Sequence, residues 1–403
     1  MKKFFLNPII STYLGLEFLI ALAAACHHAT YVPFLTEKGM NLWQINIINA
    51  FFMVVIFLAE LPTGSFADNF GRHRSLTISF IFLFIGDLVY FFSASFLLFI
   101  AAEVILAIGA TFASGASEAW MVDSLRVREE QGLQAKTFRW QPIFRTGGVI
   151  IGVVFGSYLG NFDLSWPWLA SSVLTLITIF FSLRLKENYR ESLMSKEKTG
   201  LTHQLHYAWH YGIRNYNLLL VMMFGAWLAF SVQAVNMQWT LIFKDDYGLT
   251  SLHLGYIFAA SSVVISLGAK FSQKLSSSLK EKSAIILPQV ITAAAIIICS
   301  QASSLNMMLV IFLLHNFGRG IIAPLLQDFI NNRLQSATRA TLLSLNSMFL
   351  KIGAFAGLII SGFIAEATSI RTTWLLSGLF LGLGIAIFLI AIRKKTKLSP
   401  LVT

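Results

Sequence analysis

Apolar stretches of membrane-crossing length recur along the whole chain, and they constrain its fold more than any other feature. A helix needs about 20 apolar residues to cross the ~30 Å hydrocarbon core of a bilayer. The 403-residue chain is 56% hydrophobic and 12% charged, so a soluble fold could not hide its apolar surface from water. The stretches lack the period-2 alternation of a membrane barrel. We therefore expect an all-α membrane protein.

The hydropathy pattern predicts twelve transmembrane helices in two six-helix bundles. One long polar stretch predicts an N-terminal bundle at 1–183, a cytoplasmic linker at 184–215 and a C-terminal bundle at 216–403. The first apolar stretch is too long and too polar within for a cleaved signal, so we keep it in the mature protein. The predicted spans are 8–32, 43–63, 74–94, 96–122, 138–160, 165–184, 216–243, 251–272, 283–301, 304–329, 339–364 and 370–392.

The basic residues fall mostly on one side of these spans. With the N-terminus inside, the outer loops hold only Lys38, Lys244 and Arg371, although the chain has 30 Lys and Arg in all. This asymmetry follows the positive-inside rule and predicts that both termini are cytoplasmic. The net charge of +11 is thus a topology signal, and we expect no nucleic-acid partner. Cys26 and Cys299 lie in apolar stretches, where buried thiols are expected.

The two halves contain a weak internal repeat. The segment FRTGGVIIGVVFG at 144–156 aligns with LKIGAFAGLIISG at 350–362. At the same offset Trp168 matches Trp374, and the position of His27 in the first half matches that of Gln233 in the second. Repeated halves are common in transporters. The repeat therefore predicts that the two bundles are pseudo-symmetric.

The turn between the second and third spans carries the most specific motif, Gly64-Ser-Phe-Ala-Asp68-Asn-Phe-Gly71-Arg72-His-Arg74. The motif and its place on the positive-inside face resemble the loop 2–3 signature of the major facilitator superfamily. The stretch SGASEAWMVDSL at 114–125 resembles bacterial drug/proton antiporter-like efflux members of that superfamily. The resemblance implies that the chain has the fold of this superfamily and is located in the bacterial cytoplasmic (inner) membrane.

The resemblance also implies that this turn is a conformational latch, which holds the two halves together in the outward-open state. Gly64 and Gly71 would permit a tight reversal, and Asp68 would lie at a helix start. Arg72 would bridge to a carboxylate on another span, for which Asp123 is the nearest candidate. The alternative is a solvated turn with incidental charges.

Two departures from the antiporter pattern leave antiport open. The arginine that many antiporters have in span 4 is replaced by Ile105. The span 5 motif appears only as Gly152-x-x-x-Gly156-Ser157-x-x-Gly160, without its proline. Small residues at this spacing also indicate close packing between helices.

Three carboxylates deep in the spans are candidates for proton coupling: Glu17, Glu103 and Asp87. Placing a charged side chain at such depth costs ~2.5 kcal/mol or more. A carboxylate there therefore marks a function or a specific partner. Spans 1 and 4 line the central cavity in the superfamily, so Glu17 and Glu103 are cavity candidates. Glu17 is the first choice as proton carrier, since a carboxylate in an apolar cavity can load and release protons near neutral pH. It could instead be bonded to a serine, a tyrosine or the backbone. Asp87 and Glu103 could share one proton, or Asp87 could pack against a polar partner.

Seven further residues are candidates for the substrate cavity. Adjacent helical side chains diverge, so His27 and His28 are not expected to grip one metal ion. Arg319 could receive an anionic substrate, neutralise an acid, or form a structural salt bridge. The polar residues of span 7 would suit an amphipathic ligand, or they could serve helix packing alone. The candidates are His27, His28, Gln233, Asn236, Trp239, His315 and Arg319.

These features predict a secondary active transporter, most simply a proton-coupled efflux carrier for a hydrophobic or amphipathic small molecule that works by alternating access. The alternative is a carrier for a metabolite or siderophore, by symport, uptake or export. A non-transporting receptor or a membrane enzyme is a remote alternative, since no hydrolase or metalloprotease motif is present. We expect no cofactor and no metal. The expected partners are the substrate, protons and the lipid bilayer, and the expected state is a monomer.

Overall fold

The computed structural model describes residues 2–183, 185, 216–279, 281–331 and 339–394. Their regular secondary structure is helical, and eleven of the described helices are long and apolar enough to cross a membrane. A twelfth, Trp166–Ser182, is a shorter apolar helix. The predicted all-α membrane fold is confirmed. The predicted linker 184–215 lies outside the described residues, apart from Leu185.

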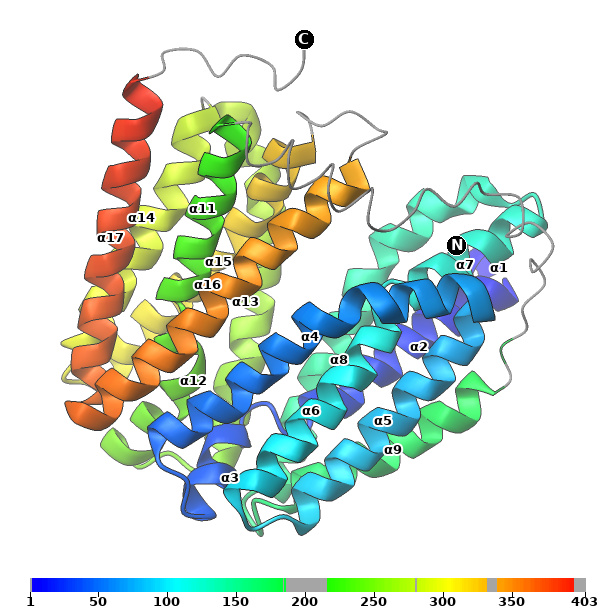
Figure 1. The fold of residues 1–403 in the computed structure, drawn as a ribbon, viewed down its shortest axis with the longest axis horizontal. Coiled ribbons are helices and arrows are strands. Elements are labelled where there is room, and N and C mark those ends of the chain that lie inside the picture. Colours follow the sequence, from blue (N-terminus) through cyan, green and yellow to red (C-terminus); the bar gives the residue numbers. More distant parts are fainter. Residues whose placement is uncertain (1, 184, 186–215, 280, 332–338, 395–403) are drawn as a thin grey trace. The chain divides into compact units, whose positions relative to one another are not determined.

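The first half of the chain contains short helices beside the long ones (Figure 1). The predicted spans 1 and 4 are each divided into two helices, α2 and α3 for the first and α6 and α7 for the fourth. The helices are α1 (Lys2–Phe5), α2 (Pro8–Ala25), α3 (Tyr31–Glu37), α4 (Leu42–Phe70), α5 (Arg72–Phe92), α6 (Phe96–Ala113), α7 (Ala116–Val127), the 3-10 turn η1 (Gln131–Leu133), α8 (Gln134–Leu159) and α9 (Trp166–Ser182).

The second half follows the predicted spans more closely, and only span 7 is divided. It is formed by α11 and α12, which are followed directly by a π-helical turn. The elements are α11 (Tyr216–Ser231), α12 (Gln233–Leu241), η3 (Ile242–Asp246), α13 (Ser251–Ser278), α14 (Glu281–Ser300), α15 (Leu305–Asn331), α16 (Arg339–Ala367) and α17 (Ile370–Lys394).

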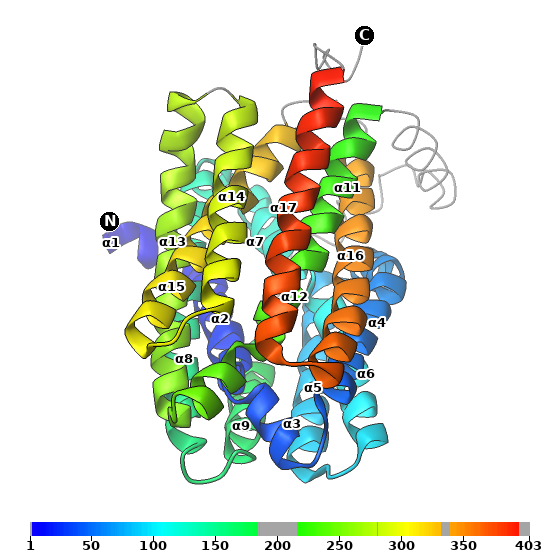
Figure 2. The same ribbon diagram turned by 90° about the vertical axis from the view of Figure 1, so that its left-hand side faces the viewer.

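The chain forms two compact units. The first comprises Met1–Met40, Phe51–Lys196 and Phe243–Ser262, and the second comprises Asn41–Ala50, Glu197–Ile242 and Val263–Thr403. In the first unit, α2 packs against α8 and α9, and α5 packs against α6 and α9. In the second, α17 contacts α14, α11 and α16 (Figure 2).

Glycines hold α8 tightly against α2 in the first unit. A methyl group on Gly148, Gly152 or Gly156 would overlap the carbonyl oxygen of a residue on or just after α2. In the second unit, methyl groups on Gly353 and Gly357 of α16 would overlap carbonyl oxygens of α11 in the same way. The glycines therefore allow close helix contact. The α2–α8 pair of the first unit and the α11–α16 pair of the second are packed through glycines in the same way.

The predicted continuous first span is wrong at residues 26–30, where a turn separates α2 from α3. The reason lies in Pro33, which is part of α3. Inside an unbroken helix the proline ring would clash with the carbonyl of residue 29. Restarting the helix at Tyr31 places the proline in a first turn, where it is tolerated. The turn contains both His27 and His28.

Span 4 is interrupted by Gly115, whose φ of 69° lies in the left-handed region. A residue with a side chain adopts this conformation at a cost, and glycine does not. α6 thus ends at Ala113, and α7 begins directly after the glycine. The break places Ser117 and Glu118 in the first turn of a new helix.

Candidate functional site

The first unit encloses a cavity of about 500 Å³. Most of its wall is apolar and comes from α2, α4, α5 and α6, including Phe52, Phe80 and Leu83. Charged and polar side chains from several helices line the rest. These side chains include Glu17, Asp87, Glu118, Gln141, Arg145 and Ser171.

Glu17 of α2 has three partners, although its side chain is nearly buried. The Ser117 hydroxyl donates to its Oε1 at 2.7 Å, and the Gln141 amide donates to its Oε2 at 3.2 Å. The Arg145 guanidinium lies 3.6 Å from Oε2. The carboxylate thus accepts from two neutral donors and has one cation beside it.

Asp87 of α5 has hydroxyl partners. Ser171 Oγ on α9 donates to its Oδ2 at 2.6 Å, and the hydroxyl of Thr175 is close by. The side chain of Asp87 is buried, and both it and Ser171 line the cavity. A hydroxyl can donate or accept, so Ser171 is able to serve as a partner to Asp87 with or without a proton.

Glu103 of α6 is buried and is not among the residues that line the cavity. The phenolic hydroxyl of Tyr90 donates to its Oε2 at 2.6 Å. Asp87 and Glu103 therefore have different hydroxyl partners, one on α9 and the other on α5. A proton shared between the two carboxylates stays a prediction.

The two predicted histidines line the cavity from the turn that follows α2. Their rings are nearly perpendicular, with centroids 5.5 Å apart. His27 stacks on Trp168, and His28 contacts Phe258. Within the described residues, no group of three or more potential ligands among His, Cys, Asp and Glu is placed to hold a metal ion.

The remaining cavity candidates lie in the second unit. Arg319 Nη1 donates to Asn236 Oδ1 at 2.6 Å, and Asn236 in turn contacts Gln233. Trp239 stacks on Phe312, with ring centroids 5.6 Å apart. His315 is buried beside the same phenylalanine. α12 and α15 thus bring all five candidates into this unit.

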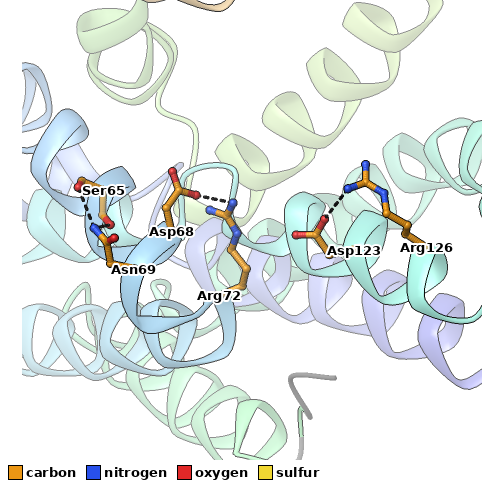
Figure 3. Close-up of polar contacts among 6 residues, drawn as sticks. All are labelled: Ser65, Asp68, Asn69, Arg72, Asp123 and Arg126. Atoms are coloured by element: carbon orange, nitrogen blue, oxygen red, sulfur yellow. Dashed lines mark hydrogen bonds and ion pairs between the residues drawn. The ribbon is translucent and has the colours of Figure 1, made fainter. Parts of the chain in front are cut away.

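The predicted latch residues pair locally in this structure. Arg72 contacts Asp68 at 2.5 Å, and Asp123 contacts Arg126 at 3.8 Å. Figure 3 shows the Arg72 guanidinium turned towards Asp68 and the Asp123 carboxylate turned towards Arg126. Both acids therefore have a neighbour in sequence as partner, and an Arg72–Asp123 bridge stays a prediction.

The structure corrects two details of the latch motif. Gly64 lies inside α4, and a Cβ there would meet no atom within 4 Å. Asp68 lies in the last turn of α4 and does not cap a helix start. The reversal itself is at Gly71, which precedes α5 with a φ of 106°. Both differences arise because α4 continues past Pro62 and Gly64 as far as Phe70.

Among the residues that line the cavity, sequence reasoning did not single out Gln141 or Glu118. Gln141 Nε2 donates to Glu17 at 3.2 Å and also to Glu118 Oε1 at 3.1 Å. Glu118 lies in the first turn of α7, beside Ser117. One signal was present in the sequence: Gln141 and Arg145 are four residues apart, a spacing that puts two side chains on one helix face.

Comparison with known proteins shows the family. The family model of the Major Facilitator Superfamily matches residues 13–335 and 219–402. The chain belongs to this superfamily of membrane transporters. It is 24% identical over 407 residues to the uncharacterised MFS-type transporter YxaM of Bacillus subtilis (strain 168), covering 96% of both chains. It is 23% identical over 294 residues to the class B tetracycline resistance protein of Escherichia coli, covering 72% of this chain and 70% of that protein.

Solved structures share the fold. The nucleoside transporter NupG superposes with a TM-score of 0.80 at 17% identity, covering 96% of this chain and 99% of that one. A D-xylose–proton symporter superposes with a TM-score of 0.69 at 12% identity, covering 95% of both chains. These likenesses define the major facilitator fold of a multi-pass membrane protein.

Proposed function

We propose that this protein is a proton-coupled efflux carrier for a hydrophobic or amphipathic small molecule, working by alternating access. The cavity of the first unit supports this proposal, because its wall is mostly apolar and has a few convergent polar groups. Such a lining suits an amphipathic ligand. The class B tetracycline resistance protein among the relatives supports efflux as the direction.

The single observation that carries proton coupling is the environment of Asp87. It lines the cavity, and its hydrogen-bond partner Ser171 is a hydroxyl at 2.6 Å. Burial in an apolar wall disfavours the charged form of a carboxyl group, and a hydroxyl partner accommodates both forms. We therefore propose Asp87 as the proton carrier.

Glu17 is the second proposed carrier, because only its Oε1, which accepts from the Ser117 hydroxyl, could take a proton and keep its partner. Its partners Gln141 and Arg145 have only N–H donors in these contacts, and neither group can accept a proton from a neutral carboxyl. Protonating Glu17 Oε2 would thus disrupt the Gln141 hydrogen bond and weaken the pairing with Arg145. Binding a charged partner suits this carboxylate better than carrying a proton.

Location and assembly are part of the proposal. We place the protein in the cytoplasmic membrane with both termini inside, on the strength of the basic residues at the inner ends of the spans. We propose a monomer. A carrier for a metabolite or siderophore is the competing proposal, and it predicts that polar nutrients are transported in place of lipophilic compounds.

Purified protein in proteoliposomes with an internal pH dye tests the proposed function. The vesicles are challenged with lipophilic cations, neutral antibiotics, siderophores and organic acids. We expect a lipophilic or amphipathic compound to trigger proton movement in the wild type and in the control Asp163→Asn, which alters an exposed loop, but not in Asp87→Asn. Proton movement triggered only by polar nutrients or siderophores would contradict the proposal. So would the absence of proton movement with every compound.

A further inference from the structure

We propose that the substrate of this cavity carries a positive charge, and that Glu118 is the specificity-determining residue that binds it together with Glu17. The inference rests on the proposed function, since it concerns the same cavity. It adds a substrate class, lipophilic organic cations, and assigns a role to a residue of α7.

The first observation is that one amide holds two carboxylates side by side. Gln141 Nε2 donates to Glu17 Oε2 at 3.2 Å and to Glu118 Oε1 at 3.1 Å. Glu17 comes from α2, Glu118 from α7 and Gln141 from α8, so three helices bring these side chains together. Two carboxylates within reach of one small neutral group repel each other unless a cation is near.

The second observation is the charge balance of the cavity. Its lining contains three carboxylates, Glu17, Asp87 and Glu118, but only one guanidinium, that of Arg145. With a proton on Asp87, the remaining two carboxylates still exceed the single cation by one charge when both are ionised. One positive charge on the substrate would complete the balance.

The third observation is that Arg145 is loosely held. Its Nη1 lies 3.6 Å from Glu17, longer than a hydrogen bond, and 63% of its side chain is exposed. Only the arginine side of this pair is exposed, because the Glu17 carboxylate is nearly buried. A cationic group of the substrate could therefore replace the guanidinium beside Glu17.

The fourth observation is an unmatched hydroxyl behind the acidic pair, on a core residue that does not itself line the cavity. Tyr13 is fully buried on α2, and its hydroxyl has no hydrogen-bond partner among the described residues. The hydroxyl lies within electrostatic range of Glu17, Glu118 and Arg145. A buried polar group without a partner is uncommon in a folded protein, and here it adds a neutral hydroxyl near the two carboxylates.

The apolar wall accounts for the rest of the substrate. Phe52, Phe80 and Leu83 line the cavity together with the acidic pair. Aromatic faces attract cations as well as apolar groups. The combination of an acidic pair and an aromatic wall fits a lipophilic cation better than a sugar or an organic acid.

Equilibrium binding of two probes of matched size and opposite charge tests the inference. Radiolabelled tetraphenylphosphonium and tetraphenylborate are titrated against the purified full-length protein in lipid nanodiscs. We expect the cation to bind and the borate to bind at least about tenfold more weakly, a factor that corresponds to ~1.4 kcal/mol. Absent binding of the cation, or a preference for the borate, would overturn the inference.

Three variants separate the roles of Glu118 and Arg145. Glu118→Gln should weaken tetraphenylphosphonium binding about tenfold, the scale expected when one partner of a close charge pair is lost. Arg145→Gln should tighten it several-fold, because a competing cation is removed, while Arg145→Lys should stay near the wild type. The control Glu37→Gln makes the same change as Glu118→Gln at an exposed site and should leave binding unchanged.

Some outcomes overturn this inference while the proposed function stands. If neutral compounds drive proton movement in proteoliposomes and Glu118→Gln leaves binding of the cation unchanged, the carrier is real but does not select for positive charge. If Arg145→Gln weakens binding of the cation, Arg145 is not a competitor. If tetraphenylphosphonium binds as expected and no compound moves protons, the proposed coupling fails and the cation site stands.

Discussion

Trp168 is held between Tyr90 and His27. The ring centroids of Trp168 and Tyr90 are 3.9 Å apart with planes 5° from parallel, and those of Trp168 and His27 are 4.0 Å apart with planes 8° from parallel. One face of the indole has no room for both rings, so they occupy opposite faces. Tyr90 also donates to Glu103. The stack therefore joins the turn after α2 to a buried carboxylate of α6.

Tyr90→Phe should keep the stack and remove the donor to Glu103. We expect the free energy of unfolding to fall by about 1–3 kcal/mol, since the buried Glu103 carboxylate loses one hydrogen-bond donor. The measurement is a denaturant titration in mixed micelles. Tyr256→Phe, at an exposed tyrosine of α13, is the matched control and should change little. Equal stability of the two variants would contradict the importance of the Tyr90 hydroxyl.

Two neighbouring glycines of α8 should respond oppositely to the same substitution. Gly152→Ala places a methyl against the Leu22 carbonyl, and such overpacking costs about 1–3 kcal/mol. At Gly147 the nearest atom to an added methyl is on Phe18 at 3.9 Å, so alanine should be neutral or stabilise the helix by up to ~1 kcal/mol. Melting temperatures of the purified variants give the comparison. A stable Gly152→Ala protein would show that α2 and α8 can move apart.

Asp68→Asn separates a latch from a solvated turn. The Asp68–Arg72 pair is four residues apart and largely exposed on its acidic side, so its loss should change stability by about 1 kcal/mol or less. If the turn acts as a latch, transport falls sharply while the melting temperature and substrate binding stay near the wild type. Transport of Asp68→Asn at the wild-type rate would contradict the latch prediction.

Arg319→Gln should reduce transport without lowering stability. In the described part of its unit the only hydrogen-bond partner of Arg319 is the amide oxygen of Asn236, and no carboxylate pairs with it. Removing a deep charge that lacks an opposite charge relieves its desolvation. We expect the melting temperature to stay the same or rise. A fall comparable with that of Gly152→Ala would indicate a structural role for the arginine.

The transmembrane spans were predictable because each depends on the hydropathy of one continuous stretch of residues. A run of apolar residues predicts a membrane helix wherever it occurs, and each predicted span coincides with observed helices. The break at residues 26–30 was missed because apolar residues lie on both sides of it, so the stretch as a whole keeps the hydropathy of a membrane span. Pro33 was the signal, and it needed to be weighed against the hydropathy of its neighbours.

The cavity was only partly predictable, because side chains from distant segments form it. Glu17 and Asp87 stood out from their depth in apolar spans. Glu118 did not, since its importance comes from Gln141, which brings it next to Glu17. No spacing in the sequence relates α2, α7 and α8 in this way. Their juxtaposition follows from glycine-mediated packing of α8 on α2 and from the break at Gly115.

The most direct test of proton coupling compares two transport modes in Asp87→Asn. Exchange of labelled for unlabelled substrate at equal concentrations needs no net proton movement, whereas uphill accumulation driven by a proton gradient does. If Asp87 carries the proton, the variant should keep exchange in proteoliposomes and lose accumulation. Accumulation at the wild-type level, or loss of exchange together with accumulation, would contradict the account.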